Sequence, residues 1–277
     1  VITRVNGKPV LGALGMGELI RNQEGKQVRL TTVSGGKTKD HIVKPIGSSY
    51  NLRYRDWEYK NRLAVEAASD KQVGYLHLRA MGSNDISQFY REFYPVFDRQ
   101  GLIIDVRYNF GGNIDSFILE KLLRKAWMYW ATRSGQPTWN MQYAFRGHMI
   151  VLVNERTASD GEAFAYGFRE LDLGKVLGTR TWGGEIWLSS GVTRLVDRGN
   201  ATAAMMGVYD DQGKWLIEGH GVDPDIVVDN LPHSTFKGED AQLDAAIKYL
   251  WKLIERDPRP VPPPPPYPDK SFNYDKQ

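Results

Sequence analysis

A serine, an aspartate and a glycine stand together in the stretch NERTASDGEAFAYGFREL, between an apolar run and an aromatic-rich helical segment. They are Ser159, Asp160 and Gly161. A serine or aspartate before a helix can cap its free backbone N–H groups, and a glycine lets the chain turn tightly. The same turn can hold a nucleophilic hydroxyl toward solvent and leave those N–H groups for a developing oxyanion. Both interpretations fit the local sequence.

A second turn that could take part in chemistry is the glycine pair of DVRYNFGGN. Gly111 and Gly112 follow an apolar run, and a glycine pair lets backbone N–H groups approach a ligand closely. Acyl transfer needs a nucleophilic hydroxyl and N–H donors for the oxygen that becomes charged. A tight turn without chemistry is the alternative for the two glycines. Asp105 and Arg107 flank the turn, and we expect them to pair across its base as architecture.

Alternating strand and helix patterns place both turns at the carboxyl ends of neighbouring strands, where open α/β sheets bind their ligands. The successive segments are QVGYLHLRAM, SNDISQFYREFYPVFDRQ, GLIIDVRYNFGGN, IDSFILEKLLRKAWMYW, HMIVLVN, DGEAFAYGFREL, KVLGTRTWGG and the closing EDAQLDAAIKYLWKLIERD. This alternation predicts an α/β fold with a mixed, largely parallel sheet flanked by helices. On the second segment, Phe89, Phe93 and Phe97 are expected to form one apolar stripe.

The pattern changes outside this core. ITRVNGKPV predicts a hairpin with an Asn-Gly turn, and EGKQVRLTTV predicts an alternating strand, so residues 1–45 form a small β module. Residues 46–72 are charged and aromatic, and we expect them to link this module to a core at 73–256. Within the core, the part that begins at SGVTRLVD is hairpin-rich. The PRPVPPPPPYP run predicts an extended tail over residues 257–277.

Composition excludes several classes of protein. Of the 277 residues, 41% are hydrophobic and 25% are charged, as in soluble globular chains. The formal net charge is +3 with Lys and Arg scattered, so we expect no nucleic-acid partner. The apolar runs are too short for a membrane span. No cysteine and no metal-ligand spacing is present, so we expect neither metal nor cofactor, and the compartment, cytoplasm or periplasm, stays open.

Several motifs resemble one family when taken in order. LIIDVRYNFGGN, VLVNERTASDGEAFAYGF, LGTRTWGG and IEGHGVDPDI are similar to the protease core shared by tail-specific (C-terminal processing) proteases and the tricorn protease, over roughly residues 74–250. ITRVNGKPV with EGKQVRLTTV resembles the latter half of the PDZ module that precedes this core. The resemblance implies a crotonase-like α/β core behind a partial PDZ-like β module.

The resemblance also implies roles for the residues of the two turns. Ser159 would be the nucleophile of a serine peptidase that forms an acyl-enzyme. The backbone N–H of Asp160 and that of Gly112 would form the oxyanion hole, with Gly111 as the alternative to Gly112.

The general base separates the two branches of the family. Gly184 stands where tail-specific proteases carry their lysine, so the tricorn-like branch fits better. That branch takes a histidine and a serine from a region before the PDZ module, which here would precede Val1, and a glutamate that corresponds to Glu218 orients the base directly or through a hydroxyl. His220, beside this motif, is the histidine of the chain that could take part instead.

Substrate preference is expected from the stretch WMYWATRSG. The archaeal tricorn enzyme carries an acidic residue in the corresponding stretch, whereas Trp130 and its neighbours include no acid. We expect Trp130, together with Gly184, to line a pocket for apolar residues, or else the aromatics pack as core. The expected substrate is a peptide or an unfolded polypeptide, and the full-length form is expected to be a homo-oligomer. The fragment alone is expected to be weakly active or inactive.

The rival hypothesis is a catalytically silent binding or scaffold module of the same fold. The interphotoreceptor retinoid-binding modules are related to this family and turn over no peptide. Such a module would bind a peptide or an apolar ligand. Retention of Ser159, Asp160, both glycines and Glu218 favours the enzyme, since a ligand carrier needs none of them.

Overall fold

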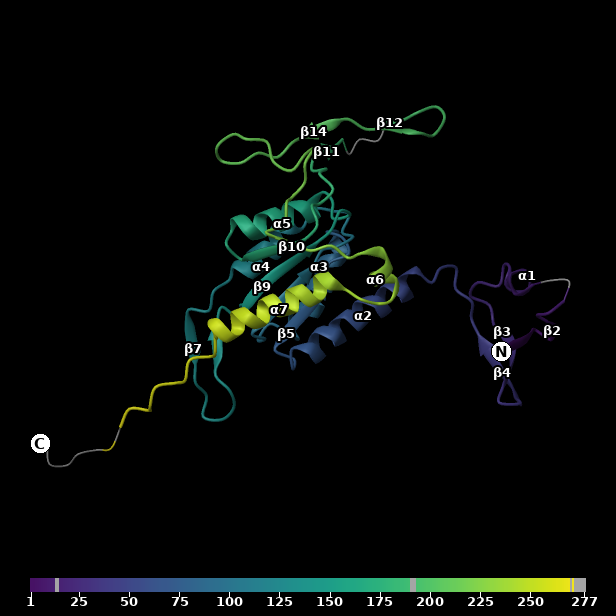
Figure 1. The fold of residues 1–277 in the computed structure, drawn as a ribbon, viewed down its shortest axis with the longest axis horizontal. Helices are drawn as coiled ribbons and strands as arrows, with labels where there is room; N and C mark the ends of the chain where they lie inside the picture. The colour runs from purple at the N-terminus through teal and green to yellow at the C-terminus, as the bar shows by residue number, and fades with distance from the viewer. Residues whose placement is uncertain (13–14, 190–192, 270, 272–277) are drawn as a thin grey trace, which may run out of the picture. The chain divides into compact units, whose positions relative to one another are not determined.

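The computed structural model divides the chain into two compact units, each with its own sheet (Figure 1). The units are Val1–Tyr59 and Lys60–Gln277. The residues that the structure describes are 1–12, 15–189, 193–269 and 271.

The first unit is built on a four-stranded antiparallel sheet with a short helix. In sheet order its strands are β2 (Lys8–Pro9), β1 (Ile2–Val5), β3 (Val28–Ser34) and β4 (Lys37–Val43), and the helix is α1 (Met16–Ile20). Asn6 and Gly7 join the first two strands with φ angles of 49° and 84°. Two successive positive φ angles are what a tight hairpin turn requires, so the predicted Asn-Gly hairpin is confirmed.

The second unit is built on a five-stranded sheet in which each neighbouring pair is parallel. In sheet order its strands are β15 (Ile226–Val227), β10 (Gly174–Gly178), β9 (His148–Val153), β6 (Gly101–Asp105) and β5 (Val73–His77). Every residue of β5, β6 and β9 is buried, which is why these strands are continuous apolar runs in the sequence. The prediction of a largely parallel sheet is confirmed.

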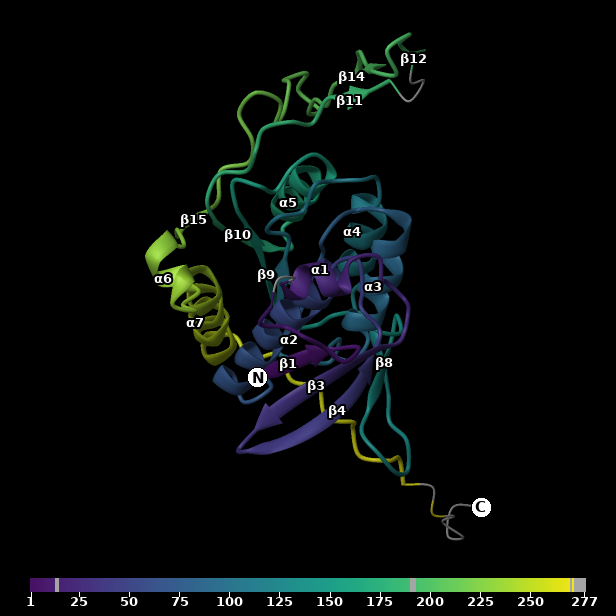
Figure 2. The same cartoon turned by 90° about the vertical axis from the view of Figure 1, so that its right-hand side faces the viewer.

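Helices cover both faces of this sheet (Figures 1 and 2). One face carries α3 (Ser83–Phe93), α4 (Asp115–Leu123) and α5 (Asp160–Glu170). The other face carries α7 (Ala241–Arg256) and the second half of α2 (Tyr50–Ala68), which packs through Val65. Most of the segment predicted as a linker is therefore the helix α2.

Two predicted helices are shorter than their periodicity indicates. Helix α3 ends at Phe93, because Pro95 lacks the N–H that a further turn needs, and Phe97 packs on the core from outside the helix. The predicted stripe on one helix is wrong in this respect. Helix α4 ends at Leu123, and Trp130 lies in a strand, since the aromatic residues that follow α4 pair with a second strand instead.

The remaining elements are short. They are the antiparallel pairs β7 (Met128–Trp130) with β8 (Thr138–Asn140), β11 (Trp187–Leu188) with β14 (Ala204–Met206), β12 (Thr193–Arg194) with β13 (Asn200–Ala201), and the helix α6 (Pro232–Phe236). The hairpin-rich region is thus confirmed as antiparallel. In the described ranges, no helix has the length and apolar character to cross a membrane.

A buried ion pair joins the carboxyl end of β6 to α7. Arg107 is 2% exposed, and its guanidinium lies 2.7 Å from Asp105 and 2.8 Å from Asp240. Asp240 in turn accepts a hydrogen bond from the N–H of Leu243 and caps α7. The predicted pairing of Asp105 with Arg107 is confirmed, and it anchors the turn that follows β6.

Replacing Phe93 with alanine tests the core under α3. Phe93 is fully buried, and its ring stacks on Phe89 with centroids 5.2 Å apart. Phe93→Ala is expected to lower the free energy of unfolding by about 3–5 kcal/mol, measured by urea denaturation. Phe236, which is 89% exposed, is the matched control, and Phe236→Ala should change the value by less than about 0.5 kcal/mol. Equal effects of the two substitutions would contradict this packing.

Candidate active site

Ser159 lies on a strained turn between β9 and α5. It is the N-cap residue of α5, and its backbone has φ 53° and ψ −133°, a conformation that residues other than glycine rarely adopt. The residue is only partly buried. A strained turn from strand to helix is the geometry that presents a nucleophilic hydroxyl, and here the same residue also begins the helix. Ser159 can therefore be both the cap of α5 and a nucleophile.

The glycine-rich turn packs directly against this serine. A Cβ on Gly111 would lie 2.8 Å from the Ser159 hydroxyl oxygen and 3.0 Å from the amide nitrogen of Asp160. A Cβ on Gly112, where φ is 155°, would lie 1.9 Å from the carbonyl oxygen of Met81. Only glycine fits at these two positions: Gly111 lets the turn pack against Ser159, and Gly112 lets it pack against the backbone of Met81.

Among the described residues, one backbone N–H group of the glycine-rich turn and one of the serine turn lack an acceptor. The N–H of Gly111 donates to Asn109 Oδ1 at 2.8 Å. Across the described part of the chain, the N–H groups of Gly112 and Asp160 have no hydrogen-bond acceptor. Of the two glycines considered from the sequence, Gly112 is therefore the one whose N–H is available to a developing oxyanion.

Asn109 holds the glycine-rich turn in place, a role that sequence reasoning missed. Its side chain is fully buried and also donates to the carbonyl of Leu78 at 2.7 Å. Its own carbonyl accepts a hydrogen bond from the N–H of Ala158 at 2.8 Å. The residue therefore ties the turn to the end of β5 and to the serine turn. An asparagine two residues before a glycine pair was the available signal.

Glu162 is the second residue that sequence reasoning missed, and it joins two segments. The side chain is fully buried. Its Oε2 accepts hydrogen bonds from the N–H of Ser159 at 3.0 Å and of Gly184 at 2.9 Å. Its Oε1 accepts from the N–H of Gly183 at 2.7 Å and from the Thr181 hydroxyl. A glutamate three residues after a helix cap is a capping-box signal, but the contacts with residues 181–184 have no local signature.

Glu218 extends this network on the other side of Gly184. Its Oε2 accepts hydrogen bonds from the N–H of Glu185 at 2.7 Å and of Ile186 at 2.9 Å. The segment from Gly184 to Ile186 thus lies between two carboxylates. The structure brings Ser159, Gly184 and Glu218 into one connected site, although among the described residues no hydrogen bond joins Glu218 to Ser159 directly.

Glu185 is an unusual member of this site. It is 2% exposed, and within the described ranges its Oε2 has no hydrogen-bond partner. Burial raises the pKa of this carboxyl to about 8, and the nearby charges of Asp160 and Glu162 act in the same direction. Glu185 therefore holds its proton at neutral pH. Nothing in the sequence distinguished it from a solvated glutamate.

The side chain of Asp160 positions α4 while its N–H stays available. The carboxylate accepts hydrogen bonds from the N–H of Ile114 at 2.7 Å and of Asp115 at 3.1 Å, at the beginning of α4. Burial raises its pKa to about 6, although the hydrogen bond from Ile114 opposes this shift. The residue after the serine therefore fixes the helix that follows the glycine-rich turn.

His220 lies near Glu218 in the chain but has another partner. Its Nε2 is 2.6 Å from Asp223, which also accepts from Arg180 at 2.7 Å, and these hydrogen bonds hold the pKa of the Asp223 carboxyl below its ordinary value. In the described part of the chain, no contact joins His220 to Ser159, and no cluster of three or more His, Asp or Glu residues could hold a metal ion.

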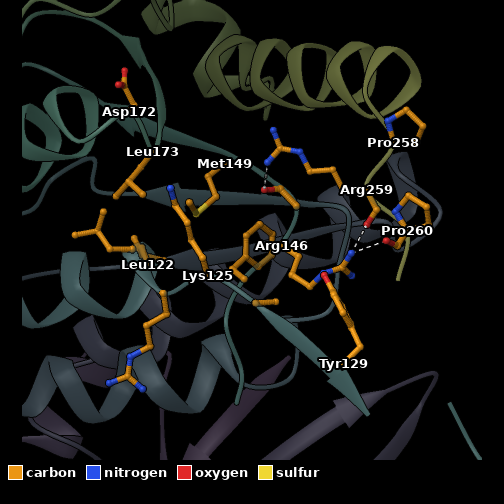
Figure 3. Close-up of a pocket in the computed structure, with 15 residues that line it drawn as sticks. Leu122, Lys125, Tyr129, Arg146, Met149, Asp172, Leu173, Pro258, Arg259 and Pro260 are labelled. Carbon is orange, nitrogen blue, oxygen red and sulfur yellow. Dashed lines mark hydrogen bonds between the residues drawn. The ribbon is translucent and has the colours of Figure 1, made fainter. Parts of the chain in front are cut away.

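Trp130 is not brought to this site within the chain. It lies in β7, whose Tyr129 lines a cavity of about 550 Å³ beside Arg146 and the first residues of the proline-rich tail (Figure 3). Arg146 donates to the Tyr129 hydroxyl at 3.2 Å and to the carbonyl of Pro260. Arg146 lies two residues before the amino end of β9, whereas Ser159 follows its carboxyl end. Trp130 as a substrate contact stays a prediction.

Comparisons with known proteins agree with this arrangement. The model of Peptidase family S41 matches residues 72–228. The chain is 35% identical, over 98% of its length, to Putative tricorn protease homolog 2 of Streptomyces coelicolor, and 33% identical, over 90% of its length, to Tricorn protease of Thermoplasma acidophilum. The crystal structure of the tricorn protease superposes on 92% of the chain with a TM-score of 0.86 and 32% identity. The resemblance identified from the motifs is confirmed.

The chain spans only part of these relatives. It covers 24% of the Streptomyces coelicolor protein, 23% of the Thermoplasma acidophilum protein and 25% of the crystallised tricorn chain. It thus spans about a quarter of the length of the relatives that it matches.

Substituting Glu162 tests whether its carboxylate holds the two segments together. In Glu162→Gln one oxygen becomes an NH₂ group that faces N–H donors, so donors lose their acceptor. We expect the free energy of unfolding to fall by about 2 kcal/mol or more, measured by urea denaturation. Glu170 lies on the same helix and is exposed, so Glu170→Gln is the control. Unchanged stability of Glu162→Gln would show that these hydrogen bonds do not support the site.

Substituting Glu185 tests its buried, protonated state through the pH dependence of stability. The carboxyl ionises near pH 4.5 in the unfolded chain and near pH 8 in the folded one. Between these values the folded state holds one more proton, so the stability of the wild type falls as pH rises. Glu185→Gln has no carboxyl to ionise at this position, so its stability does not fall with pH for this reason. Its stability relative to the wild type should increase from pH 5 to pH 8, as measured by urea denaturation.

The matched control for this pH series is Glu239→Gln, because Glu239 is exposed. Its stability relative to the wild type should not change across the same pH range. If Glu185→Gln behaves like Glu239→Gln, the Glu185 carboxyl is ionised in the fold and its burial does not raise its pKa.

Proposed function

The chain belongs to peptidase family S41, and on this premise we propose that it carries the core of a serine peptidase that cleaves peptides or unfolded polypeptides through an acyl-enzyme on Ser159. One observation supports this most directly: the strained serine packs against the glycine-rich turn at Gly111, and the N–H groups of Gly112 and Asp160 have no acceptor among the described residues. A turn that served only as a helix cap would not need a second turn of glycines packed against the hydroxyl.

In the proposed first step, the Ser159 hydroxyl oxygen attacks the carbonyl carbon of the scissile peptide bond, and a general base takes its proton. The carbonyl oxygen becomes an oxyanion, which accepts hydrogen bonds from the N–H groups of Gly112 and Asp160. The carbon–nitrogen bond then breaks, and the leaving amine receives the proton from the base. Water hydrolyses the resulting ester by the same steps and restores Ser159.

The general base is proposed to be a histidine that this chain does not contain, as the resemblance to the tricorn-like branch implies. Glu218 would orient it directly or through a hydroxyl. One oxygen of Glu218 already holds the N–H groups of Glu185 and Ile186, whereas its Oε1 has no hydrogen bond among the described residues. That free oxygen supports the orienting role, because a third group must fix the tautomer of the base.

We also propose a partial PDZ-like module, peptide substrates and a homo-oligomeric full-length form. The four-stranded sheet with its short helix supports the assignment of residues 1–45 as part of a PDZ-like module. The names of the tricorn proteases among its relatives support peptide substrates. The resemblance to that branch is the reason for proposing a homo-oligomeric full-length form.

Fluorophosphonate labelling tests the proposed nucleophile. The full-length protein should form one adduct, located on Ser159 by mass spectrometry, because the reagent needs an activated hydroxyl. Ser159→Ala should abolish the adduct. Ser116→Ala is the matched control, since Ser116 is an exposed serine on α4, and labelling should remain within twofold of the wild type.

Labelling of residues 1–277 alone shows where the base lies. We expect little adduct on this fragment, because it lacks the proposed histidine. A full-length protein that is folded but remains unlabelled would contradict the peptidase proposal and favour the silent binding module.

A further inference from the structure

A second cavity lies beside Glu218 in the hairpin-rich part of the core. It has a volume of about 450 Å³. Its apolar walls include Ile186, Met205, Met206 and Trp215, and Glu218 contributes a carboxylate. Neither the sequence patterns nor the resemblance to known peptidases assigned a role to the four apolar residues.

The walls of this cavity are held by contacts within the chain. Trp215 forms a β-bridge with Tyr209, and their rings meet edge to face with centroids 6.0 Å apart. The N–H of Leu216 donates to the carbonyl of Val208 at 3.0 Å. A Cβ on Gly207 would lie 2.9 Å from the indole of Trp215, so glycine lets the ring lie against the backbone. These contacts fix the position of Trp215 and therefore the shape of the cavity.

The cavity is connected to the serine turn through two carboxylates. Glu162 Oε2 accepts from the N–H of both Ser159 and Gly184, so these nitrogens lie no more than about 6 Å apart. Ile186, on the cavity wall, follows Gly184 by two residues, which span at most about 7 Å. Because an extended peptide advances about 3.3 Å per residue, Ile186 on the cavity wall lies within about four residues of a peptide bond held at Ser159.

The chemistry of the lining favours an apolar occupant. Met205 is 67% exposed and Trp215 is 71% exposed, and such large exposed apolar side chains grouped around one hollow mark a binding surface. Methionine side chains adapt to ligands of different shape. The negative charge of Glu218 is partly neutralised by the two N–H groups that donate to its Oε2, which weakens its attraction for a cation.

We propose that this cavity binds an aliphatic or aromatic side chain of the substrate polypeptide, within four residues of the scissile bond. This inference rests on the proposed peptidase function and names part of its substrate class. The cavity has the volume for one large side chain, and burying that side chain against Met205, Met206 and Trp215 would remove apolar surface from water on both sides.

The test uses fluorogenic peptides and the full-length protein. Peptides carry leucine, phenylalanine, lysine, serine or aspartate at one position at a time, over four positions on each side of the cleaved bond. At one of these positions, kcat/KM should be about tenfold or more higher for leucine or phenylalanine than for serine. Ala204→Trp, which places an indole into the cavity, should remove this preference and act mainly through KM.

Val196→Trp is the matched control, because it adds the same side chain to an exposed position of the same hairpin region outside the cavity. It should keep the wild-type preference. A preference for lysine, or a leucine preference that Ala204→Trp leaves unchanged, would overturn the inference while the peptidase proposal stands. Failure of the wild type to react with a fluorophosphonate would instead overturn the peptidase proposal itself.

Discussion

A carboxylate that is fully removed from water must be matched by hydrogen-bond donors, and Glu162 meets this requirement with donors from two separate segments. One donor is the amide of Ser159, and the others belong to residues 181–184. The serine turn and the 181–184 segment therefore cannot move apart without leaving a buried charge unmatched. Glu218, although exposed, adds to this network, since it holds the next two amides of that segment. The geometry of the candidate site depends on this pair of carboxylates.

The acidic residues of the site differ by what surrounds them. Asp160 accepts hydrogen bonds from the beginning of α4, and Glu162 and Glu218 accept from backbone amides, so each carboxylate has a structural partner. The buried Oε2 of Glu185 has none among the described residues, and its pKa is the one raised to about 8. The beginnings of α4 and α5 lie in the same region, and the positive ends of helix dipoles favour negative charge there. This explains how several carboxylates share one small volume.

The contacts at the carboxyl ends of the parallel strands differ from those at the amino ends. At the carboxyl ends, the turns after β6 and β9 bring Gly111 and Ser159 together. At the amino end of β9, Arg146 binds the beginning of the proline-rich tail through the carbonyl of Pro260. The alternation of strands and helices already predicted this polarity, because parallel strands bring all of their carboxyl ends to one edge.

Features that depend on a few adjacent residues were determined by the sequence itself: the Asn-Gly hairpin, the buried parallel strands, and the two turns that carry Ser159 and the glycine pair. Only the tertiary structure decided which glycine N–H is free, because that depends on the side chain of Asn109, which lies between distant strands. The early end of α4 was likewise decided by the pairing of β7 with β8, and the burial of Glu185 by its neighbours in space. Local patterns report backbone preference, whereas desolvation and hydrogen-bond partners are set by neighbours in space, and no spacing in the sequence encodes those.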